Sequence, residues 1–186
     1  MCLRGIVTPA EREAAGKVIA AASFAPGRAT AIGGARDRKD NLQLERARCA
    51  EIGRIDRMLV DALCRDPEFN RATLVRRFAQ FLYARYEPGM RYGPHVDAGI
   101  FGSGTTDPMR SDLAVTIFLS DLTDYDGGEL VLDTPLGMYS VKLPAGDVVV
   151  YPATTLHEVR PVTRGVRLVA VTWVQSWVRD LLAREI

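Results

Sequence analysis

The stretch YSVKLPAGDVVVYPATTLHEVRPVTRGVRLVAVTWVQS, residues 139–176, decides the fold of this chain. Short runs rich in valine and other strand-forming residues alternate in it with turn residues, which predicts strands over 139–143, 147–152, 157–162 and 166–176. The turns lie at Arg164-Gly165 and at Pro144-Ala145-Gly146, and we expect the latter to close a hairpin. Short strands at such close spacing favour an antiparallel double sheet over alternating strand and helix units.

The same pattern extends toward the N-terminus. We predict further strands over 113–120 and 128–133, and one more within 76–88. Turn signals at Asp126-Gly127-Gly128 and Pro135-Leu136-Gly137 separate them, and we expect the two consecutive glycines to serve a turn that a Cβ atom would not allow. The predicted fold class is therefore mainly β (α+β): a double-stranded β-helix, or jelly roll, with supporting N-terminal helices.

The first third of the chain supplies those helices. Thr8-Pro9-Ala10-Glu11 has the pattern of a capping box with proline at the first helical position, which predicts a helix to about Ser23. Apolar residues at helical spacing predict a second helix over 46–65, and we expect a strand, a loop and a short strand between the two. We expect one domain over 1–186, with helical support over 8–65 and a jelly-roll core over about 74–177.

Composition limits the classes of function. The chain is 47% hydrophobic and 25% charged with a formal net charge of +1, which gives no support to a nucleic-acid or membrane partner. Its three cysteines, Cys2, Cys49 and Cys64, form no C-x-x-C pair and favour a reducing compartment. The sequence has no signal-peptide pattern and no apolar run of about 18 residues, so we expect a cytoplasmic protein.

The chain has two histidines, and both lie at the edges of predicted strands. Asp97 follows His95 by two positions, so an extended backbone directs both side chains to one side. His157 comes much later, but distant strands face each other in a jelly roll. Two imidazoles and one carboxylate are the ligand set of non-haem Fe(II) oxygenases. The pair His95 and Asp97 alone is weak support, because an H-x-D pattern is common without metal.

Arg167 strengthens the prediction. It precedes Val169, Val171 and Trp173 on one face of the strand 166–176, which suggests a guanidinium that points into the barrel. A buried guanidinium needs an anionic partner, and its fork matches a carboxylate. A dicarboxylate that chelates the metal at its other end satisfies this need. The alternatives are that Arg167 lies exposed at a strand end, or that Arg160 or Arg164 takes its place.

Taken together, four segments resemble the PKHD-type hydroxylases of bacteria, in the prolyl and lysyl hydroxylase-like branch of the Fe(II)/2-oxoglutarate dioxygenases. The segments, in chain order, are YEPGMRYGPHVDAG, RSDLAVTIFLSDLTDYDGGELVL, VKLPAGDVVVYPATTLHEVRPVTRGVR and VTWVQSWVRD. The resemblance covers roughly residues 75 to 180, and the N-terminal part fits more loosely. Many members of that family continue into a helical tail beyond the last segment, so no tail-based dimer interface or substrate contact is carried over.

The resemblance implies roles for individual residues. His95, Asp97 and His157 would be the iron ligands, Arg167 would bind the distal carboxylate of 2-oxoglutarate, and Tyr86 would lie near this co-substrate unless it only packs in the core. Some relatives hold the co-substrate with a tyrosine on the strand that contains Phe118 here, so such a contact must come from elsewhere. The implied reaction is hydroxylation of an unactivated C–H bond with O2, with release of succinate and CO2, and L-ascorbate would keep the iron reduced.

Two other classes stay open on the sequence: a cupin-like metal dioxygenase or isomerase that does not use 2-oxoglutarate, and a non-enzymatic iron or 2-oxoglutarate sensor. The substrate is undetermined. The resemblance suggests a prolyl, lysyl or other amino-acid side chain, free or in a peptide or protein, and a small metabolite is equally open. We expect substrate contacts from the glycine-rich segment 98–112, a mobile lid or an ordinary loop, and from the segment around Arg36 to Gln43. The oligomeric state, monomer or homodimer, is likewise undetermined.

Overall fold

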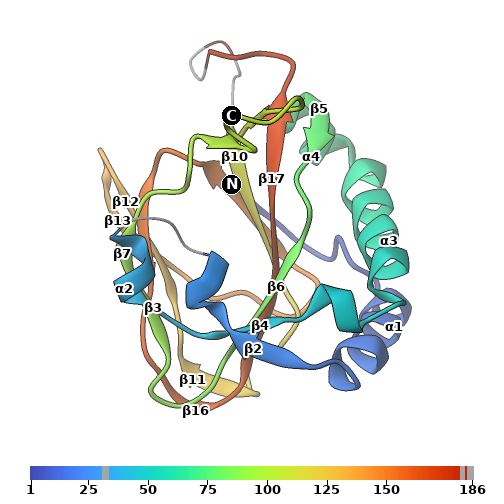
Figure 1. The fold of residues 1–186 in the computed structure, drawn as a ribbon, viewed down its shortest axis with the longest axis vertical. Coiled ribbons are helices and arrows are strands. Elements are labelled where there is room, and N and C mark those ends of the chain that lie inside the picture. Colours follow the sequence, from blue (N-terminus) through green and yellow to red (C-terminus); the bar gives the residue numbers. More distant parts are fainter. Residues whose placement is uncertain (31–33, 181–182, 184–186) are drawn as a thin grey trace.

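A computed structural model describes residues 1–30, 34–180 and 183, and it contains two antiparallel sheets that face each other (Figure 1). The larger sheet has the order β1-β14-β10-β17-β6-β4-β2, and β5 pairs with β17 beside this path. Its strands are β1 (Cys2–Leu3), β14 (Val148–Pro152), β10 (Leu113–Phe118), β17 (Arg167–Ser176), β6 (Leu82–Tyr86), β4 (Leu42–Leu44), β2 (Phe24–Pro26) and β5 (Val75–Phe78). This arrangement confirms the predicted jelly roll.

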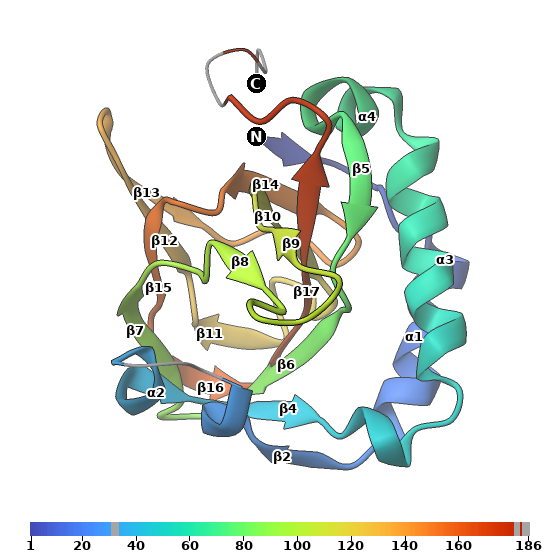
Figure 2. The ribbon, with the colours of Figure 1, turned by 45° about the horizontal axis from the view of Figure 1, so that its top comes forward.

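The smaller sheet has the order β13-β12-β15-β7-β3. Its strands are β13 (Gly137–Val141), β12 (Leu130–Thr134), β15 (Leu156–Val159), β7 (Arg91–His95) and β3 (Lys39–Asp40). Two ribbons complete the strands: β11 (Tyr125–Gly127) with β16 (Val162–Gly165), and β8 (Ile100–Phe101) with β9 (Met109–Arg110). Figure 2 shows the β8–β9 hairpin in front of the space between the two sheets.

Helices cover the outer face of the larger sheet (Figure 1). They are α1 (Pro9–Ala20), α3 (Ile52–Arg65) and α4 (Pro67–Thr73), while α2 (Ala35–Arg38) lies beside β7 and the short 3-10 helices are η1 (Gly27–Thr30) and η2 (Arg46–Arg48). Within the described part of the chain, no helix combines the length and apolar character that a membrane span needs.

The larger sheet is buried on both faces, and this explains its apolar strands. Along β10, Leu113, Val115 and Ile117 pack in the cluster that includes the helices, while Ala114 and Phe118 pack in the cluster between the two sheets. Successive side chains of a strand point to opposite faces, so a strand with helices on one side and a second sheet on the other is apolar on both faces, and its one polar residue, Thr116, lines the cavity between the sheets.

The structure corrects the predicted helices in three places. The capping box at Thr8 and Glu11 is present, but α1 ends at Ala20 and not near Ser23. The second helix begins at Ile52 and not at Arg46. Arg46 lies in the 3-10 helix η2, where its guanidinium donates hydrogen bonds to Asp56 and to the Phe81 carbonyl. Helix α4 was not predicted, although the Asp66 carboxylate accepts a hydrogen bond from the Phe69 N–H and the adjacent proline gives a readable N-terminal signal.

Two strand predictions also change. The segment 76–88 holds two strands, β5 and β6, and both pair with β17. The predicted hairpin at Pro144-Ala145-Gly146 is wrong, because this turn joins β13 of the smaller sheet to β14 of the larger one. By contrast, β12 and β13 do pair across the turn at Leu136. Gly127 and Gly128 have φ values of +69° and +66°, which confirms that this turn needs glycine.

Candidate active site

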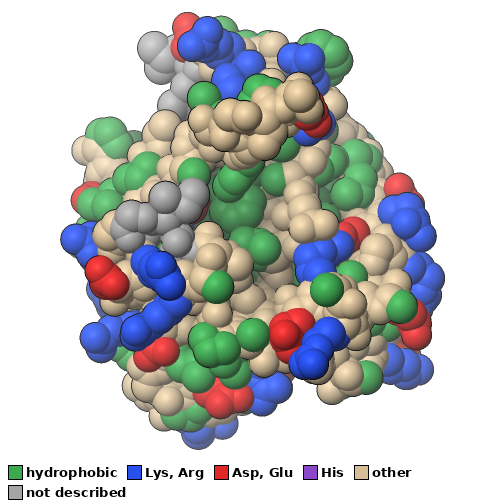
Figure 3. Space-filling view, in the orientation of Figure 1, with side chains coloured by type: hydrophobic (Ala, Val, Ile, Leu, Met, Phe, Trp, Pro, Cys, Tyr) green, Lys and Arg blue, Asp and Glu red, His purple; other side chains and the backbone are tan. Residues whose placement is uncertain are grey.

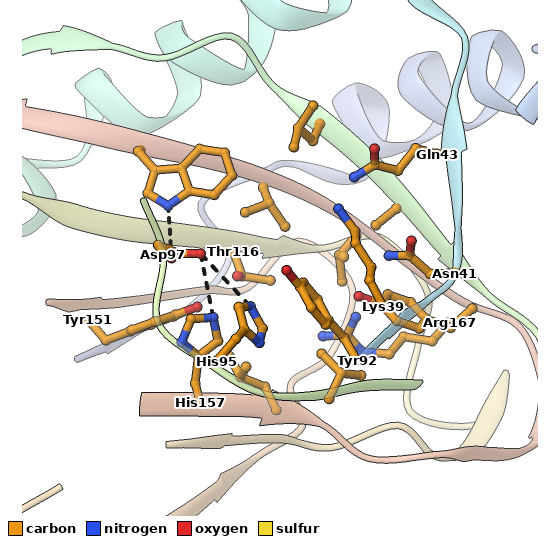
Figure 4. A pocket seen from close by; sticks show the side chains of 18 residues that line it. Lys39, Asn41, Gln43, Tyr92, His95, Asp97, Thr116, Tyr151, His157 and Arg167 are labelled. Carbon is orange, nitrogen blue, oxygen red and sulfur yellow. Dashed lines mark hydrogen bonds and ion pairs between the residues drawn. The ribbon is translucent and has the colours of Figure 1, made fainter. Parts of the chain in front are cut away.

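Adjacent strands of the smaller sheet bring His95, Asp97 and His157 together. His95 ends β7 and His157 lies on β15, and the pairing of these strands sets the two residues directly opposite each other. Asp97 Oδ1 lies 3.9 Å from His95 Nε2 and 3.8 Å from His157 Nε2. The three side chains converge on one point between the sheets (Figure 4), and their ligand atoms all lie within 4.8 Å of one another. These distances suit a single metal ion.

Backbone carbonyls orient both imidazoles. His95 Nδ1 donates to Gly93 O at 2.8 Å, and His157 Nδ1 donates to Thr155 O at 2.9 Å. A carbonyl oxygen only accepts hydrogen bonds, so in each ring the proton is on Nδ1 and the lone pair of Nε2 faces Asp97. Burial, with a smaller contribution from His157, lowers the pKa of His95 to about 3. The imidazole of His95 is therefore neutral, as metal coordination requires.

Trp173 fixes the carboxylate of Asp97. Its indole Nε1 donates to Asp97 Oδ2 at 2.9 Å, which leaves Oδ1 facing the two histidines. Burial raises the pKa of Asp97, and His157, the Trp173 hydrogen bond and Lys39 offset this rise only in part. A cation between the three side chains would supply that compensation, so the donor set fits a divalent metal. The sequence placed Trp173 on the same strand face as Arg167 but did not show this hydrogen bond.

Arg167, the first residue of β17, is 1% exposed, which excludes the alternative of an exposed strand end. The guanidinium lies 5.1 Å from the Tyr86 ring and 5.5 Å from the Phe118 ring, and its Nε and Nη1 have no hydrogen-bond partner among the described residues. A buried guanidinium with free donors needs an anion. The carboxylate of a co-substrate such as 2-oxoglutarate fits this place.

The other two candidate arginines lie elsewhere. Arg164 is exposed and forms a bidentate pair with Asp126 on the surface. Arg160 is also exposed and approaches Glu158 at 3.9 Å. Neither side chain lines the cavity that holds the histidines. Arg167 is therefore the arginine that reaches this cavity.

Tyr86 lies directly opposite Arg167 in the pairing of β6 with β17. It is buried, and burial raises the pKa of its hydroxyl while the nearby Arg167 lowers it. A hydrogen bond from Asn41 also lowers the pKa of this hydroxyl. Tyr86 thus lines the same cavity as Arg167.

The segment around Arg36 to Gln43 reaches the cavity through alternate residues. Lys39, Asn41 and Gln43 all line it and are 5%, 3% and 8% exposed. Because they are spaced by two in an extended backbone, they point the same way. Substrate contacts were predicted for this segment but not for these individual side chains, which the K-x-N-x-Q alternation could have identified.

Comparison with known proteins places the chain among related sequences. The family model of the 2OG-Fe(II) oxygenase superfamily matches residues 81–175. A PKHD-type hydroxylase of Xanthomonas campestris pv. campestris (strain 8004) is 42% identical over 185 residues, which cover 97% of this chain and 80% of the relative. A PKHD-type hydroxylase of Thermosynechococcus vestitus is 43% identical over 182 residues, with the same shares of 97% and 80%.

Solved structures support the same fold at lower identity. A prolyl-4-hydroxylase of Pseudomonas putida has a TM-score of 0.60 at 21% identity, and the match covers 96% of this chain and 92% of that one. A viral collagen prolyl hydroxylase from Paramecium Bursaria Chlorella virus-1, solved as a 2-oxoglutarate complex, has a TM-score of 0.58 at 18% identity over 96% of each chain. The chain belongs to the 2OG-Fe(II) oxygenase superfamily, among its PKHD-type hydroxylases, and is an Fe(II)- and 2-oxoglutarate-dependent dioxygenase.

Proposed function

We propose that His95, Asp97 and His157 hold the iron and that Arg167 binds the distal carboxylate of 2-oxoglutarate. The observation that carries this assignment is the convergence of three ligand atoms within 4.8 Å of one another, in the same cavity as a buried guanidinium with free donors. Three protein ligands leave coordination positions open for a co-substrate and O2. Tyr86 packs against Arg167 and helps to shape the co-substrate site.

Iron bound at this site with 2-oxoglutarate supplies an oxidative decarboxylation that consumes O2, releases succinate and CO2, and places one oxygen atom in a C–H bond of the substrate. The protein's own residues do the rest. The carbonyls of Gly93 and Thr155 orient the imidazoles, Trp173 orients Asp97, and the two sheets bury both histidines. This division of labour is typical of cofactor enzymes.

For the substrate we propose an amino-acid side chain, prolyl, lysyl or another, free or in a peptide or protein. The names of the relatives support this class, since they are PKHD-type hydroxylases, and the similar solved structures include prolyl hydroxylases. We also propose that L-ascorbate sustains turnover by reducing oxidised iron.

We further propose that residues 1–186 act as one catalytic domain and that the protein works in the cytoplasm. The first proposal rests on the helices, which pack in one apolar cluster with the larger sheet. The second rests on the free thiols of Cys2, Cys49 and Cys64, which suit a reducing compartment.

The test of the assignment combines metal binding with turnover. Purified protein with Fe(II) should convert 2-oxoglutarate to succinate, and a substrate screen followed by mass spectrometry should find a product heavier by one oxygen. His95→Ala and Asp97→Ala should abolish both Fe(II) binding and succinate release. Val96→Ala is the matched control, because Val96 lies between the two ligands but is 48% exposed. Full turnover in His95→Ala or Asp97→Ala would show that the assignment is wrong.

A further inference from the structure

The cavity contains a buried lysine that the reaction does not require. The chain has only three lysines, and Lys39 is 5% exposed. The ammonium of Lys39 donates a hydrogen bond to Thr30 Oγ1 at 2.8 Å and lies 5.2 Å from the centre of the Tyr92 ring. Among the described residues it forms no ion pair, and Asp97 acts on it only through a longer-range attraction. A buried ammonium without an anionic partner is costly unless a ligand supplies one.

Lys39 lies apart from the groups assigned to the co-substrate. In Figure 4 its ammonium points toward Gln43, away from the Arg167 guanidinium. Arg167 is already available for the distal carboxylate of 2-oxoglutarate, and the histidines and Asp97 for the metal. The positive charge of Lys39 is therefore available for a different ligand.

When Fe(II) and 2-oxoglutarate are bound, the charges in the cavity also leave one positive charge without a partner. The Fe(II) dication and Asp97 together give one positive charge, Lys39 and Arg167 add two, and the 2-oxoglutarate dianion removes two, while imidazoles that bind a metal are neutral. A site with one excess positive charge is complementary to a ligand with a single negative charge.

The hydrogen-bond partner of Lys39, Thr30, lines a groove that adjoins the cavity. Leu82 and Trp173 line both the inner cavity and a second pocket, the outer groove, of about 380 Å³. The outer groove is also lined by Phe78, Phe101 and Met109 and, on the Lys39 side, by Thr30. Figure 3 shows apolar side chains gathered in this hollow. Its two charged residues, Arg77 and Asp107, pair with each other at 2.8 Å and leave the groove without net charge.

We propose that Lys39 binds a carboxylate of the substrate, while an apolar part of the same substrate occupies the outer groove. This inference rests on the proposed function, because it takes the iron and 2-oxoglutarate as bound. Thr30 orients the ammonium, since its hydroxyl accepts from Lys39 and bonds Gln43 Oε1 at 2.7 Å. Burial lowers the pKa of Lys39 to about 8, so the group is still mostly charged at neutral pH. The carboxylate can come from a free amino acid, from the C-terminus of a peptide, or from an internal Asp or Glu.

The experiment compares matched carboxylates and amides. The probes are free L-amino acids and their carboxamides, peptides ending in an acid or an amide, and peptides with internal Asp or Glu and their Asn or Gln counterparts. Binding is read without turnover, from the change that each probe causes in the visible absorption of the anaerobic Fe(II)–2-oxoglutarate protein, and succinate release is measured in parallel. For at least one of these three kinds of probe pair, we expect the carboxylate probe to bind at least about tenfold more tightly than its amide counterpart.

Lys39→Met should remove this preference and Lys39→Arg should keep part of it, while 2-oxoglutarate affinity stays unchanged in both. Lys142→Met is the matched control. Lys142 also donates to a neutral oxygen, the Tyr125 carbonyl at 2.7 Å, and also lies over a tyrosine ring, but it does not line the cavity. If Lys39→Met does not fold, Lys39→Arg and the acid–amide comparison in the wild type still give the answer.

Three results would overturn the inference: equal binding of acids and amides, an unchanged preference in Lys39→Met, or no binding of any probe to the loaded wild-type protein. A loss of 2-oxoglutarate affinity in Lys39→Met, comparable to that in Arg167→Met, would instead assign Lys39 to the co-substrate. Failure of the proposed function looks different, because the wild type would then show neither the Fe(II)–2-oxoglutarate absorption nor succinate release.

Discussion

The two oxygens of Asp97 have different partners, and this difference defines the site at the scale of single residues. Oδ2 accepts from the Trp173 indole, and Oδ1 faces His95 and His157. A hydrogen bond to the outer oxygen fixes the rotation of the carboxylate, so the inner oxygen is in place before a metal arrives. Groups that orient metal ligands in this way commonly raise metal affinity by about 10- to 100-fold.

Trp173→Phe should therefore weaken Fe(II) binding by about 10- to 100-fold while the ring still fills its place between the sheets. Metal titration under anaerobic conditions measures this, and the absorption of the Fe(II)–2-oxoglutarate complex should shift as well. The chain has one other tryptophan, Trp177, which is 69% exposed, so Trp177→Phe is the matched control. Equal metal affinity in wild type and Trp173→Phe would assign Trp173 to packing alone.

Replacing Arg167 should weaken 2-oxoglutarate binding without lowering the stability of the protein that lacks co-substrate. Arg167→Met should lose most 2-oxoglutarate affinity, because the buried guanidinium has free donors that suit a carboxylate. Without co-substrate, the same variant should be as stable as the wild type or more stable, by about 1 kcal/mol, because it removes a buried charge that lacks an anionic partner. Chemical denaturation and 2-oxoglutarate titration measure the two effects. Arg164→Met, which loses only an exposed pair, should change neither quantity appreciably.

At the scale of elements, β17 places the largest share of the site. Arg167, Val169, Val171 and Trp173 point into the cavity from alternate positions, and the other face of the strand packs toward the helices through Ala170 and Val174. The strand β17 lies between β10 and β6 and pairs with both. A strand held on both edges and buried on both faces keeps its side chains in fixed positions, as a binding site requires.

The turn before β12 makes room for Arg167. A Cβ atom on Gly128 would lie 2.9 Å from Val162 Cγ2 and 3.0 Å from Arg167 Cδ, and the residue has φ of +66°. Gly128→Ala should therefore lose about 1–2 kcal/mol for the backbone conformation and about 1–3 kcal/mol more for crowding, and it should weaken 2-oxoglutarate binding.

Gly5→Ala separates these two contributions. Gly5 has a similar φ of +61°, but nothing lies within 4 Å of an added Cβ atom. This variant should show only the smaller loss of unfolding free energy and normal 2-oxoglutarate affinity. Thermal unfolding and co-substrate titration compare the two variants. A Gly128→Ala protein that matched Gly5→Ala in both measurements would refute the role of Gly128 in placing Arg167.

At the scale of the whole molecule, the site joins the two sheets. The histidines and Asp97 come from the smaller sheet and the segment that follows β7, whereas Arg167 and Trp173 come from the larger sheet. Fe(II) with 2-oxoglutarate should therefore bridge the sheets and stabilise the folded state. Ligand at about 100 times its Kd contributes about 2.7 kcal/mol, which corresponds to a rise in Tm of about 5–10 °C for a chain of this size.

Anaerobic thermal unfolding with and without Fe(II) and 2-oxoglutarate tests this prediction, and a chelator should reverse the rise. His157→Ala is the control, because it removes one of the three proposed metal ligands and should show little or no rise. A rise of the same size in His157→Ala would mean that the ligands stabilise the protein from another place.

Much of this protein was predictable from local patterns. The alternation of short β-branched runs with turn residues identified the jelly roll, and the Thr8 capping box identified the first helix, because both depend on neighbours a few residues apart. The chemistry was also present in the composition. A chain with two histidines, an H-x-D pair and an arginine among alternate apolar residues offers few other candidates for a metal and co-substrate site. The sequence by itself therefore determined the types of groups in the site and the class of fold that carries them.

What only the tertiary structure decided were the contacts between residues far apart in the chain. Strand pairing sets His157 opposite His95, brings the Trp173 indole to a carboxylate 76 positions earlier, and buries Lys39 beside the ring of Tyr92. It also placed the turn at Pro144 between two sheets and not within a hairpin, because the partners of β13 and β14 lie in different sheets. Sequence patterns report on local backbone geometry, whereas these contacts depend on which strands share hydrogen bonds, and that choice minimises the free energy of the whole packed core.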